Sequence, residues 1–255
     1  LVFSEAVALF SSSADITVPN LDNGAGSGTL STMTSSDAIT WAGTFTPTAN
    51  TEDATNTLSL ATSYTDLAGN NGSAATTANY EVETLAPTVS SVAITSASGV
   101  QNSLLNAGDV VSVTATFSEA VVVDTTSGNP TLTLVVGSNN RTATYASGSG
   151  STDLVFRYTI QATGTSGEND SNGISIGANA LALNSGIIRD AAGNNGTLTH
   201  SAVSDNSGYK VDTTLPTVDS FTLSDTELKA GDTATVQLVF SEAVALFSSS
   251  ADITV

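Results

Sequence analysis

The chain begins and ends with the same eighteen residues, LVFSEAVALFSSSADITV. Leu1 recurs as Leu238 and Val18 recurs as Val255, so the sequence covers one period of 237 residues and the start of the next. Inside that period the motif FSEAV occurs once more, at residues 117–121. Each period therefore contains two related units, which is the pattern of a repeat architecture. We interpret the chain as part of a tandem array.

Two further motifs recur once in each unit, in the same order relative to FSEAV. The segment DLAGNNG at residues 66–72 corresponds to DAAGNNG at 190–196, and VETLAPTV at 82–89 corresponds to VDTTLPTV at 211–218. The first pair shares the pattern DxAGN, which is rich in turn-forming residues. The second pair has the composition of a linker between units.

Proline restricts its own backbone and that of the residue before it, which favours an extended boundary segment. We therefore place unit boundaries at Pro87 and Pro216. This predicts a partial domain over residues 1–86 that lacks its first strand, a complete domain over 87–215, and the N-terminal part of a further domain over 216–255. A complete unit has the size of a small β-sandwich.

Apolar and polar residues alternate along several short segments, as in strands with one buried and one exposed face. Val111, Val113, Ala115 and Phe117 share one such face. Seven strands are expected in the complete unit, at residues 89–96, 110–117, 131–136, 140–146, 152–161, 180–189 and 198–212. This pattern predicts an all-β fold of tandem immunoglobulin-like antiparallel β-sandwiches, arranged end to end.

The charge of the chain excludes several classes of partner. The net charge is −19, and the first Lys or Arg in the sequence is Arg141. Nucleic acid and anionic membrane surfaces are therefore poor partners, because a phosphate partner needs Lys or Arg to displace its counterions. No apolar run reaches the roughly 18 residues of a membrane helix, so we expect no membrane insertion of this segment. The absence of cysteine excludes disulfides and thiolate metal sites.

The expected strand order brings acidic motifs together. If seven strands reverse in turn, FSEAV ends the second strand and DxAGN ends the sixth, so both lie at one pole beside the linker from the preceding unit. At the junction that enters the complete unit, the predicted cluster consists of Glu83, Glu119, Asp190 and Asn194. Like charges in such a cluster repel unless a cation lies among them.

The junction that leaves the complete unit has corresponding residues. Asp212 comes from the linker and Glu242 from the following FSEAV, whose equivalent in the first copy is Glu5. Asp66 and Asn70 are the DxAGN residues that correspond to this junction in the copy one period earlier. Carboxylate and amide oxygens are the ligands that Ca²⁺ prefers, so both junctions are predicted calcium sites. The alternative interpretation is that DxAGN is only a stable turn and the FSEAV glutamate a solvated strand end.

A second candidate calcium site lies in the segment SGENDSNGIS, at residues 166–175. Glu168, Asp170 and Asn172 alternate before a glycine, as in half of a DxDxDG loop, but the spacing of a full calcium loop is missing. A polar loop without a metal is the alternative. The motif AGD also falls near the exit junction, where Asp109 is either a further ligand or part of a tight turn.

In this order, FSEAV, DxAGN and the linker V(D/E)TxxPTV resemble the bacterial immunoglobulin-like repeats of giant cell-surface adhesins, of the biofilm-associated and repeats-in-toxin type. The resemblance covers essentially the whole chain. It implies a secreted, extracellular protein of many tandem sandwiches, in which Ca²⁺ stiffens a rod that holds a distal adhesive domain away from the cell. It implies the calcium role for Glu119, Asp190, Asn194, Glu83 and Asp212, although Glu83 departs from the Asp more usual in that linker.

We therefore expect a structural extender whose partners are neighbouring repeats of the same polypeptide and, in the second hypothesis, identical chains that associate laterally into a fibre, sheath or surface layer. The third hypothesis is a carbohydrate- or protein-binding module, with Trp41 as a candidate for sugar stacking. Trp41 lies on an alternating apolar face, however, which favours the core. No enzyme is expected, because the only histidine, His200, accompanies no GxSxG or HExxH motif.

Overall fold

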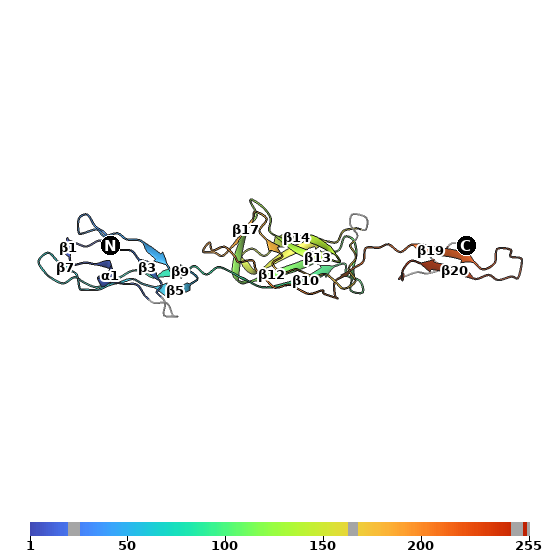
Figure 1. The fold of residues 1–255 in the computed structure, drawn as a ribbon, viewed down its shortest axis with the longest axis horizontal. Helices are drawn as coiled ribbons and strands as arrows, with labels where there is room; N and C mark the ends of the chain where they lie inside the picture. The colour runs from blue at the N-terminus through green and yellow to red at the C-terminus, as the bar shows by residue number, and fades with distance from the viewer. Residues whose placement is uncertain (20–25, 163–167, 246–251, 254–255) are drawn as a thin grey trace.

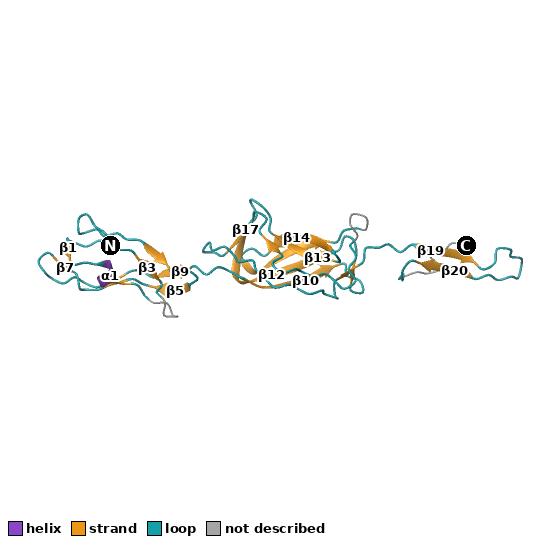
Figure 2. Cartoon of the chain, in the orientation of Figure 1, coloured by secondary structure: helices purple, strands orange, loops and turns teal. Residues whose placement is uncertain are grey.

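The computed structural model describes residues 1–19, 26–162, 168–245 and 252–253. The fold is nearly all β, with 46% of residues in strands and 2% in a helix, and its sheets are predominantly antiparallel. Figure 1 shows three groups of strands that follow one another along the longest axis, and Figure 2 shows that loops join them. Every pair of strands in the described residues joins members of the same group.

The first group contains short strands around one helical turn. Its elements are β1 (Val7–Ala8), α1 (Ser12–Asp15), β2 (Ile16–Thr17), β3 (Gly28–Leu30), β4 (Phe45–Pro47), β5 (Glu52–Asn56), β6 (Ser59–Leu60), β7 (Thr65–Asp66), β8 (Ala75–Thr76) and β9 (Tyr80–Glu83). They form four small antiparallel sheets, β1-β7, β2-β6-β8, β3-β4 and β5-β9.

Aromatic side chains form the core of the first group. The ring centroid of Phe10 lies 4.9 Å from that of Trp41 and 5.5 Å from that of Phe3. Tyr64 lies 4.8 Å from Phe3 and is almost completely buried. Trp41 is thus part of a packed aromatic cluster, in agreement with its place on the alternating apolar face.

The second group contains the long strands. Its elements are β10 (Val89–Ser98), β11 (Leu104–Leu105), β12 (Val110–Asp124), β13 (Thr131–Val136), β14 (Asn139–Ser147), β15 (Ser151–Thr159), β16 (Leu181–Ala182), β17 (Ile187–Arg189) and β18 (Lys210–Val211). The main sheet has the order β10-β12-β15-β14-β13-β16, and β17 pairs with the far end of β12. β11 and β18 pair with each other in parallel.

The alternation along β12 places every second side chain in the core. Val111, Val113 and Ala115 are fully buried and Phe117 is 2% exposed, whereas the polar residues between them are half-buried. Strands β13 and β15 contribute Leu132, Leu134, Leu154 and Phe156 to the same core. The predicted strands at residues 89–96, 131–136, 140–146 and 152–161 are therefore confirmed within a few residues, and the strand predicted at 110–117 forms the first part of β12.

β12 is longer than predicted, since it continues through FSEAV as far as Asp124. A register shift between Thr116 and Val121 interrupts the pairing with β15, and the strand then pairs with β17. A bulge of this kind breaks the alternation of polar and apolar residues while the strand goes on. The expectation that FSEAV ends the strand and begins a loop is therefore wrong.

The last two predicted strands are wrong in extent. Residues 180–189 form two short strands, because Asn184 and Ser185 have positive φ and the Gly186 N–H donates to the Leu183 carbonyl to close a turn. Of residues 198–212, only β18 is a strand, and a turn in which the Tyr209 N–H donates to the Asn206 carbonyl precedes it. The parallel pairing of β18 also departs from the predicted all-antiparallel order.

The third group is a single antiparallel hairpin of β19 (Val218–Leu223) and β20 (Val236–Phe240). Its pairing matches that of β10 with β12, the equivalent strands of the second group. Among the residues that the structure describes, no helix has both the length and the apolar character to cross a membrane. The boundaries at Pro87 and Pro216 fall between the strand groups and stay a prediction.

The buried face of β12 predicts how the second group responds to substitution. We expect Phe117→Ala to lower the free energy of unfolding by about 3–5 kcal/mol, because it leaves a cavity between β12 and the strands around it. Urea denaturation followed by circular dichroism measures the change. Val122→Ala is the control in the same strand, since the Val122 side chain is 41% exposed. Equal effects of the two substitutions would contradict the assigned core.

Candidate metal centre

The two DxAGN segments form the same hydrogen-bonded turn. Asp190 Oδ1 accepts hydrogen bonds from the N–H groups of Gly193 (2.6 Å) and Asn194 (2.8 Å), and Oδ2 accepts one from Asn194 Nδ2 (2.7 Å). Asp66 accepts bonds from the Asn70 N–H and side-chain amide in the same way, at 2.8 and 2.7 Å. The glycine of each turn has positive φ, which explains why a glycine occupies that position. DxAGN is therefore a stable turn whether or not it also contacts an ion.

The structure brings FSEAV beside DxAGN in both units where the two motifs occur. In the second group, the end of β12 pairs with β17, which leads directly into Asp190. In the first group, β1 begins at the last residue of FSEAV and pairs with β7, with Val7 opposite Asp66. This adjacency agrees with the prediction, although strand pairing rather than a shared loop produces it.

The entry junction brings together the four predicted residues. Asn194 Nδ2 lies 3.3 Å from the carbonyl oxygen of Glu83 and 3.5 Å from its Oε1, and contacts Asp190 as described. Burial raises the pKa of Glu119 above its ordinary value, and the negative charges of Glu83, Asp190 and Glu52 add to that shift. All the charged groups that shift this pKa are acidic.

Glu52 also belongs to this junction, although no motif in the sequence indicated that it would lie near the other acidic residues. It lies in β5 directly opposite Glu83 in β9. The pairing partner of a short strand is a long-range property, so sequence spacing gave no reason to connect the two glutamates. The one local signal is the adjacent pair Glu52 and Asp53 in a chain with few charged residues.

Hydrogen bonds keep the carboxylate of Asp190 ionised within this acidic surrounding. Burial opposes its ionisation, but the bonds from Asn194 and the Gly193 N–H outweigh burial and lower the pKa of Asp190. Side-chain and backbone bonds from Asn70 likewise lower the pKa of Asp66. Both turns therefore present a negative charge at neutral pH.

The donor chemistry of the entry junction suits calcium, because carboxylates and an amide side chain supply only hard oxygen ligands. Across residues 1–19, 26–162, 168–245 and 252–253, however, no three acidic, histidine or cysteine side chains are arranged closely enough to hold a metal ion. The carboxylates of Glu83 and Asp190 are near enough to that of Glu119 to raise its pKa, but within the described residues the three do not form a closed ligand shell. The junction would have to contract for these residues to bind one ion together.

The exit junction contains the two predicted acidic residues in one pocket. Asp212 and Glu242 line a cavity of about 380 Å³ together with Asn169 and Asp170. Asp212 Oδ1 accepts a hydrogen bond from the Thr214 N–H at 3.0 Å. Glu242 Oε1 is buried and has no hydrogen-bond partner among the described residues. An unpaired buried carboxylate oxygen is costly, which makes this atom a candidate ligand for a cation.

Two other predicted ligands have different surroundings. Asp109 Oδ2 accepts a hydrogen bond from the Asn106 N–H at 2.8 Å, and Asp232 in the equivalent AGD accepts one from the Lys229 N–H at 3.1 Å. AGD is thus a tight turn in both copies. Glu5 is exposed and lies two residues before β1, and Figure 1 shows β1 at the opposite end of the first group from β9.

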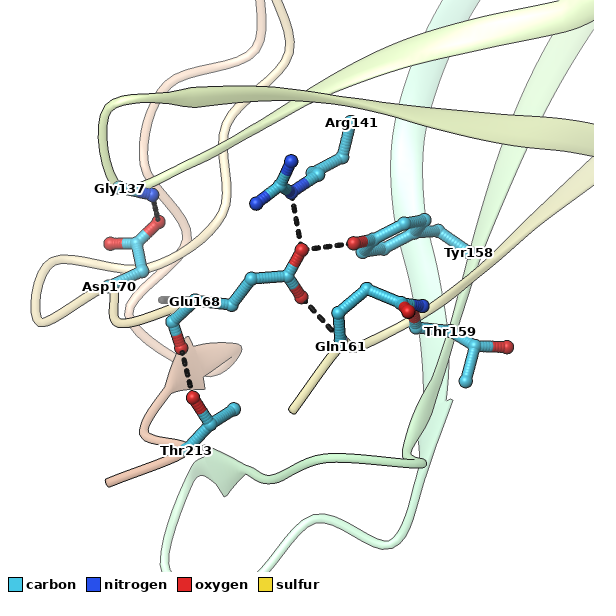
Figure 3. A network of polar contacts seen from close by, with 8 residues as sticks. All are labelled: Gly137, Arg141, Tyr158, Thr159, Gln161, Glu168, Asp170 and Thr213. Carbon is cyan, nitrogen blue, oxygen red and sulfur yellow. Dashed lines mark hydrogen bonds and ion pairs between the residues drawn. The ribbon is translucent and has the colours of Figure 1, made fainter. Parts of the chain in front are cut away.

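Glu168 belongs to a buried polar network in the second group. Its side chain is fully buried and points between Tyr158, Arg141 and Gln161 (Figure 3). Tyr158 OH donates a hydrogen bond to Oε1, which also forms an ion pair with Arg141 Nε. Oε2 accepts a bond from the Gln161 N–H at 2.6 Å. Burial, and then the bond to Glu168, raises the pKa of Tyr158, so the phenol remains a donor.

Asp170 orders the next part of the same loop. Its carboxylate accepts hydrogen bonds from the N–H groups of Gly137 and Gly173, both at 2.8 Å, and its side chain is 3% exposed. Asn172 Nδ2 donates to Asp205 Oδ2 instead. These contacts account for the burial of Glu168 and Asp170 without a metal ion. Residues 166 and 167 of the predicted calcium loop lie outside the described residues.

His200 holds two backbone segments together. Its Nε2 accepts a hydrogen bond from the Ala180 N–H at 2.8 Å, and its Nδ1 lies 2.8 Å from the Ser201 carbonyl oxygen. The imidazole is therefore neutral, with the proton on Nδ1. The expectation that His200 lies in a strand is wrong, because its hydrogen bonds join two irregular segments.

Comparison with known families gave a match within the first group of strands. Residues 1–82 match the bacterial Ig-like domain family. A search of curated proteins and a search of solved structures each gave no match to this chain. Bacterial Ig-like domains are non-enzymatic structural modules, typical of surface proteins. The match supports the Ig-like part of the resemblance and leaves the giant-adhesin part as a proposal.

The buried network predicts a large effect of removing its acid. Glu168→Ala should lower the free energy of unfolding by about 3–5 kcal/mol, because Arg141 and Tyr158 lose a buried charged partner. Urea denaturation measures the loss. The control is Glu227→Ala at an exposed turn, for which we expect a change within about 0.5 kcal/mol. A Glu168→Ala variant as stable as this control would show that the network contributes nothing to stability.

The acidic entry junction predicts a substitution that stabilises the protein. The raised pKa of Glu119 means that the folded chain retains its proton where the unfolded chain has lost it, so stability falls as pH rises from about 4.5 through the folded pKa. In metal-free buffer at pH 7, Glu119→Gln should raise the Tm by a few degrees, on the order expected for removing one repulsive charge. The gain should disappear near pH 4, which thermal melts at both pH values will test.

Proposed function

We propose that this chain is a run of structural extender repeats of a large secreted cell-surface adhesin. Ca²⁺ stiffens its junctions, so that the repeats project a distal adhesive domain for attachment or biofilm formation. The bacterial Ig-like match of residues 1–82 supports a structural module of a surface protein. The recurring motifs support a series of such modules, because a rod gains length with each added repeat.

One observation carries the calcium part of the proposal. Glu83 from the linker, Glu119 from FSEAV and the Asp190 turn come from three separate segments and converge at one junction, where only acidic groups act on Glu119. Uncompensated like charges destabilise such a junction. A divalent cation is the simplest group that removes this repulsion, and an acidic chain with five lysines and arginines has few alternatives.

The exit junction supports the same function with a different observation. Within the part of the chain that the structure describes, Glu242 has a buried oxygen with no hydrogen-bond partner, and Asp212 lines the same pocket. In this proposal Glu83, Glu119, Asp190 and Asn194 hold the ion at the entry, and Asp212 and Glu242 hold one at the exit. The ion supplies positive charge and fixed coordination. The chain's residues supply oxygen ligands from two adjacent units, so binding restricts the angle between them.

The alternatives have less support. Trp41 is packed in an aromatic cluster, which removes the side chain that suggested sugar stacking. A sheath or surface layer formed by lateral assembly requires a continuous contact surface along the chain, whereas the exposed large apolar residues are scattered over all three groups of strands. The extender therefore accounts for more of the described features than either alternative.

Thermal melting and small-angle scattering of the 255-residue chain, with Ca²⁺ and with chelator, test the proposal. An ion that binds only the folded junctions must raise the Tm, by RT ln(1 + [L]/Kd) in free energy. Closing both junctions should also lengthen and stiffen the particle, which scattering reports as a larger maximum dimension. If chelation changes neither the Tm nor the scattering curve, the calcium proposal fails.

Substitutions assign the effect to the junctions. Glu83→Gln with Glu119→Gln should remove most of the calcium-dependent rise in Tm at the entry, and Glu242→Gln should remove the contribution of the exit. Glu227→Gln carries the same charge change at an exposed turn outside both clusters and should leave the calcium response unchanged. If both junction variants kept the same calcium response as the Glu227→Gln control, the ion would bind elsewhere.

A further inference from the structure

A pocket lies beside the outer edge of β10, in the body of the second group. It has a volume of about 510 Å³ and is lined by residues 89–92, 179 and 199–203. Ligand sites in proteins typically have volumes of about 300–1,000 Å³. All the lining residues belong to the second group, and the chain continues on both sides of that group, so neither end of the sequence bounds the pocket.

Two segments that are bonded to each other at one point separate to form this pocket. The Thr197 N–H donates to the Pro87 carbonyl at 2.8 Å, and the Val89 N–H donates to the Thr197 carbonyl at 3.3 Å. A register shift in β10 follows directly, between Val89 and Ser91. Because a bulge bends the strand that contains it, β10 leaves the neighbouring segment here. Beyond Val89, the described backbone of β10 pairs with β12 alone.

Residues 199–201 form the opposite wall and are held from their other side. The Asn179 N–H donates to the His200 carbonyl at 3.2 Å, and the His200 N–H donates to Asn179 Oδ1 at 3.0 Å. The segment forms no helix or turn, and in an extended backbone neighbouring N–H groups point to opposite sides. The N–H groups of Thr199 and Ser201 therefore face the pocket, and neither donates a hydrogen bond within the described part of the chain.

The side chains around the pocket are polar but uncharged. No Asp, Glu, Lys or Arg lines it, although the net charge of the chain is −19. The lining hydroxyl groups of Ser90, Ser91, Thr199 and Ser201 form no hydrogen bonds among the described residues. β10 itself contains no charged residue and no proline, two features by which edge strands commonly keep other strands away. The pocket therefore suits a neutral ligand that can bond to two backbone edges.

We infer that the pocket binds an extended, uncharged segment of a partner protein, which adds a strand between β10 and residues 199–201. An extended peptide fits two facing edges, because its N–H and carbonyl groups alternate between its two sides and bond to both walls at once. A neutral sugar matches the hydroxyl groups but not this two-sided backbone pattern. The extender would thus also bind a partner along its length, with one such site in each period and avidity from the repeats.

Peptide binding to the 255-residue chain tests the inference. The probes are a set of short synthetic peptides made of glycine, serine, threonine and valine, and the same set with methyl groups on alternate backbone nitrogens. Amide hydrogen exchange followed by NMR should show that the unmethylated peptides slow exchange at the N–H groups of Thr199 and Ser201. Methylation removes backbone donors and should weaken binding roughly ten- to thirtyfold.

Matched variants locate the site. Ser201→Asp places a carboxylate in the pocket and should abolish binding, because an uncharged strand would leave that charge without a partner. Ser127→Asp makes the same change at an exposed bend of the second group that does not line the pocket, and it should bind the peptides as the unchanged chain does. Circular dichroism confirms that both variants are folded.

A neutral oligosaccharide, maltohexaose, is the competing probe. Protection of the two N–H groups by the sugar and by no peptide would overturn the inference, and so would a set of peptides of which none binds. Equal binding of methylated and unmethylated peptides would also contradict it. Binding should persist in chelator, so this inference and the calcium proposal can fail independently.

Discussion

The continuity of β12 underlies the rest of the second group. Its alternating side chains fill the core, its two edges hold β10 and β15, and its far end carries FSEAV to the DxAGN turn. A strand that is bonded on both edges and buried on one face has little freedom to shift, because a slip of one residue would expose every core side chain. The position of Glu119 at the junction is therefore fixed by packing elsewhere in the same strand.

The sequence allowed prediction of features that depend on local alternation and on repeats. The long strands, the all-β class and the meeting of Glu83, Glu119, Asp190 and Asn194 follow from these two signals. The continuation of β12 was missed because a bulge breaks the alternation, and the extent of the last strand was overestimated because turn residues follow Val203. Glu52 was missed because its pairing with Glu83 is not encoded in spacing.

Acidic residues have two different environments in this chain. Glu168 and Asp170 are buried, and nearby donors satisfy their oxygens, so they order a loop. Glu119 lies near other acids, and Glu242 has a buried oxygen for which residues 1–19, 26–162, 168–245 and 252–253 supply no hydrogen-bond partner. From the sequence alone, both kinds of residue were candidate calcium ligands. The distinction depends on Arg141 and Tyr158, which lie in strands β14 and β15 and meet Glu168 only through the fold.

The parallel pairing of β11 with β18 has a mechanical consequence. The chain leaves the second group just after β18, where the Asp212 N–H donates to the Leu105 carbonyl at 2.9 Å and the Lys210 N–H to the Ser103 carbonyl at 3.1 Å. A pull on the two ends of this group would slide β18 along β11, so these hydrogen bonds would be loaded together and not one after another. The last strand is therefore held in shear when the two ends of the group are pulled apart.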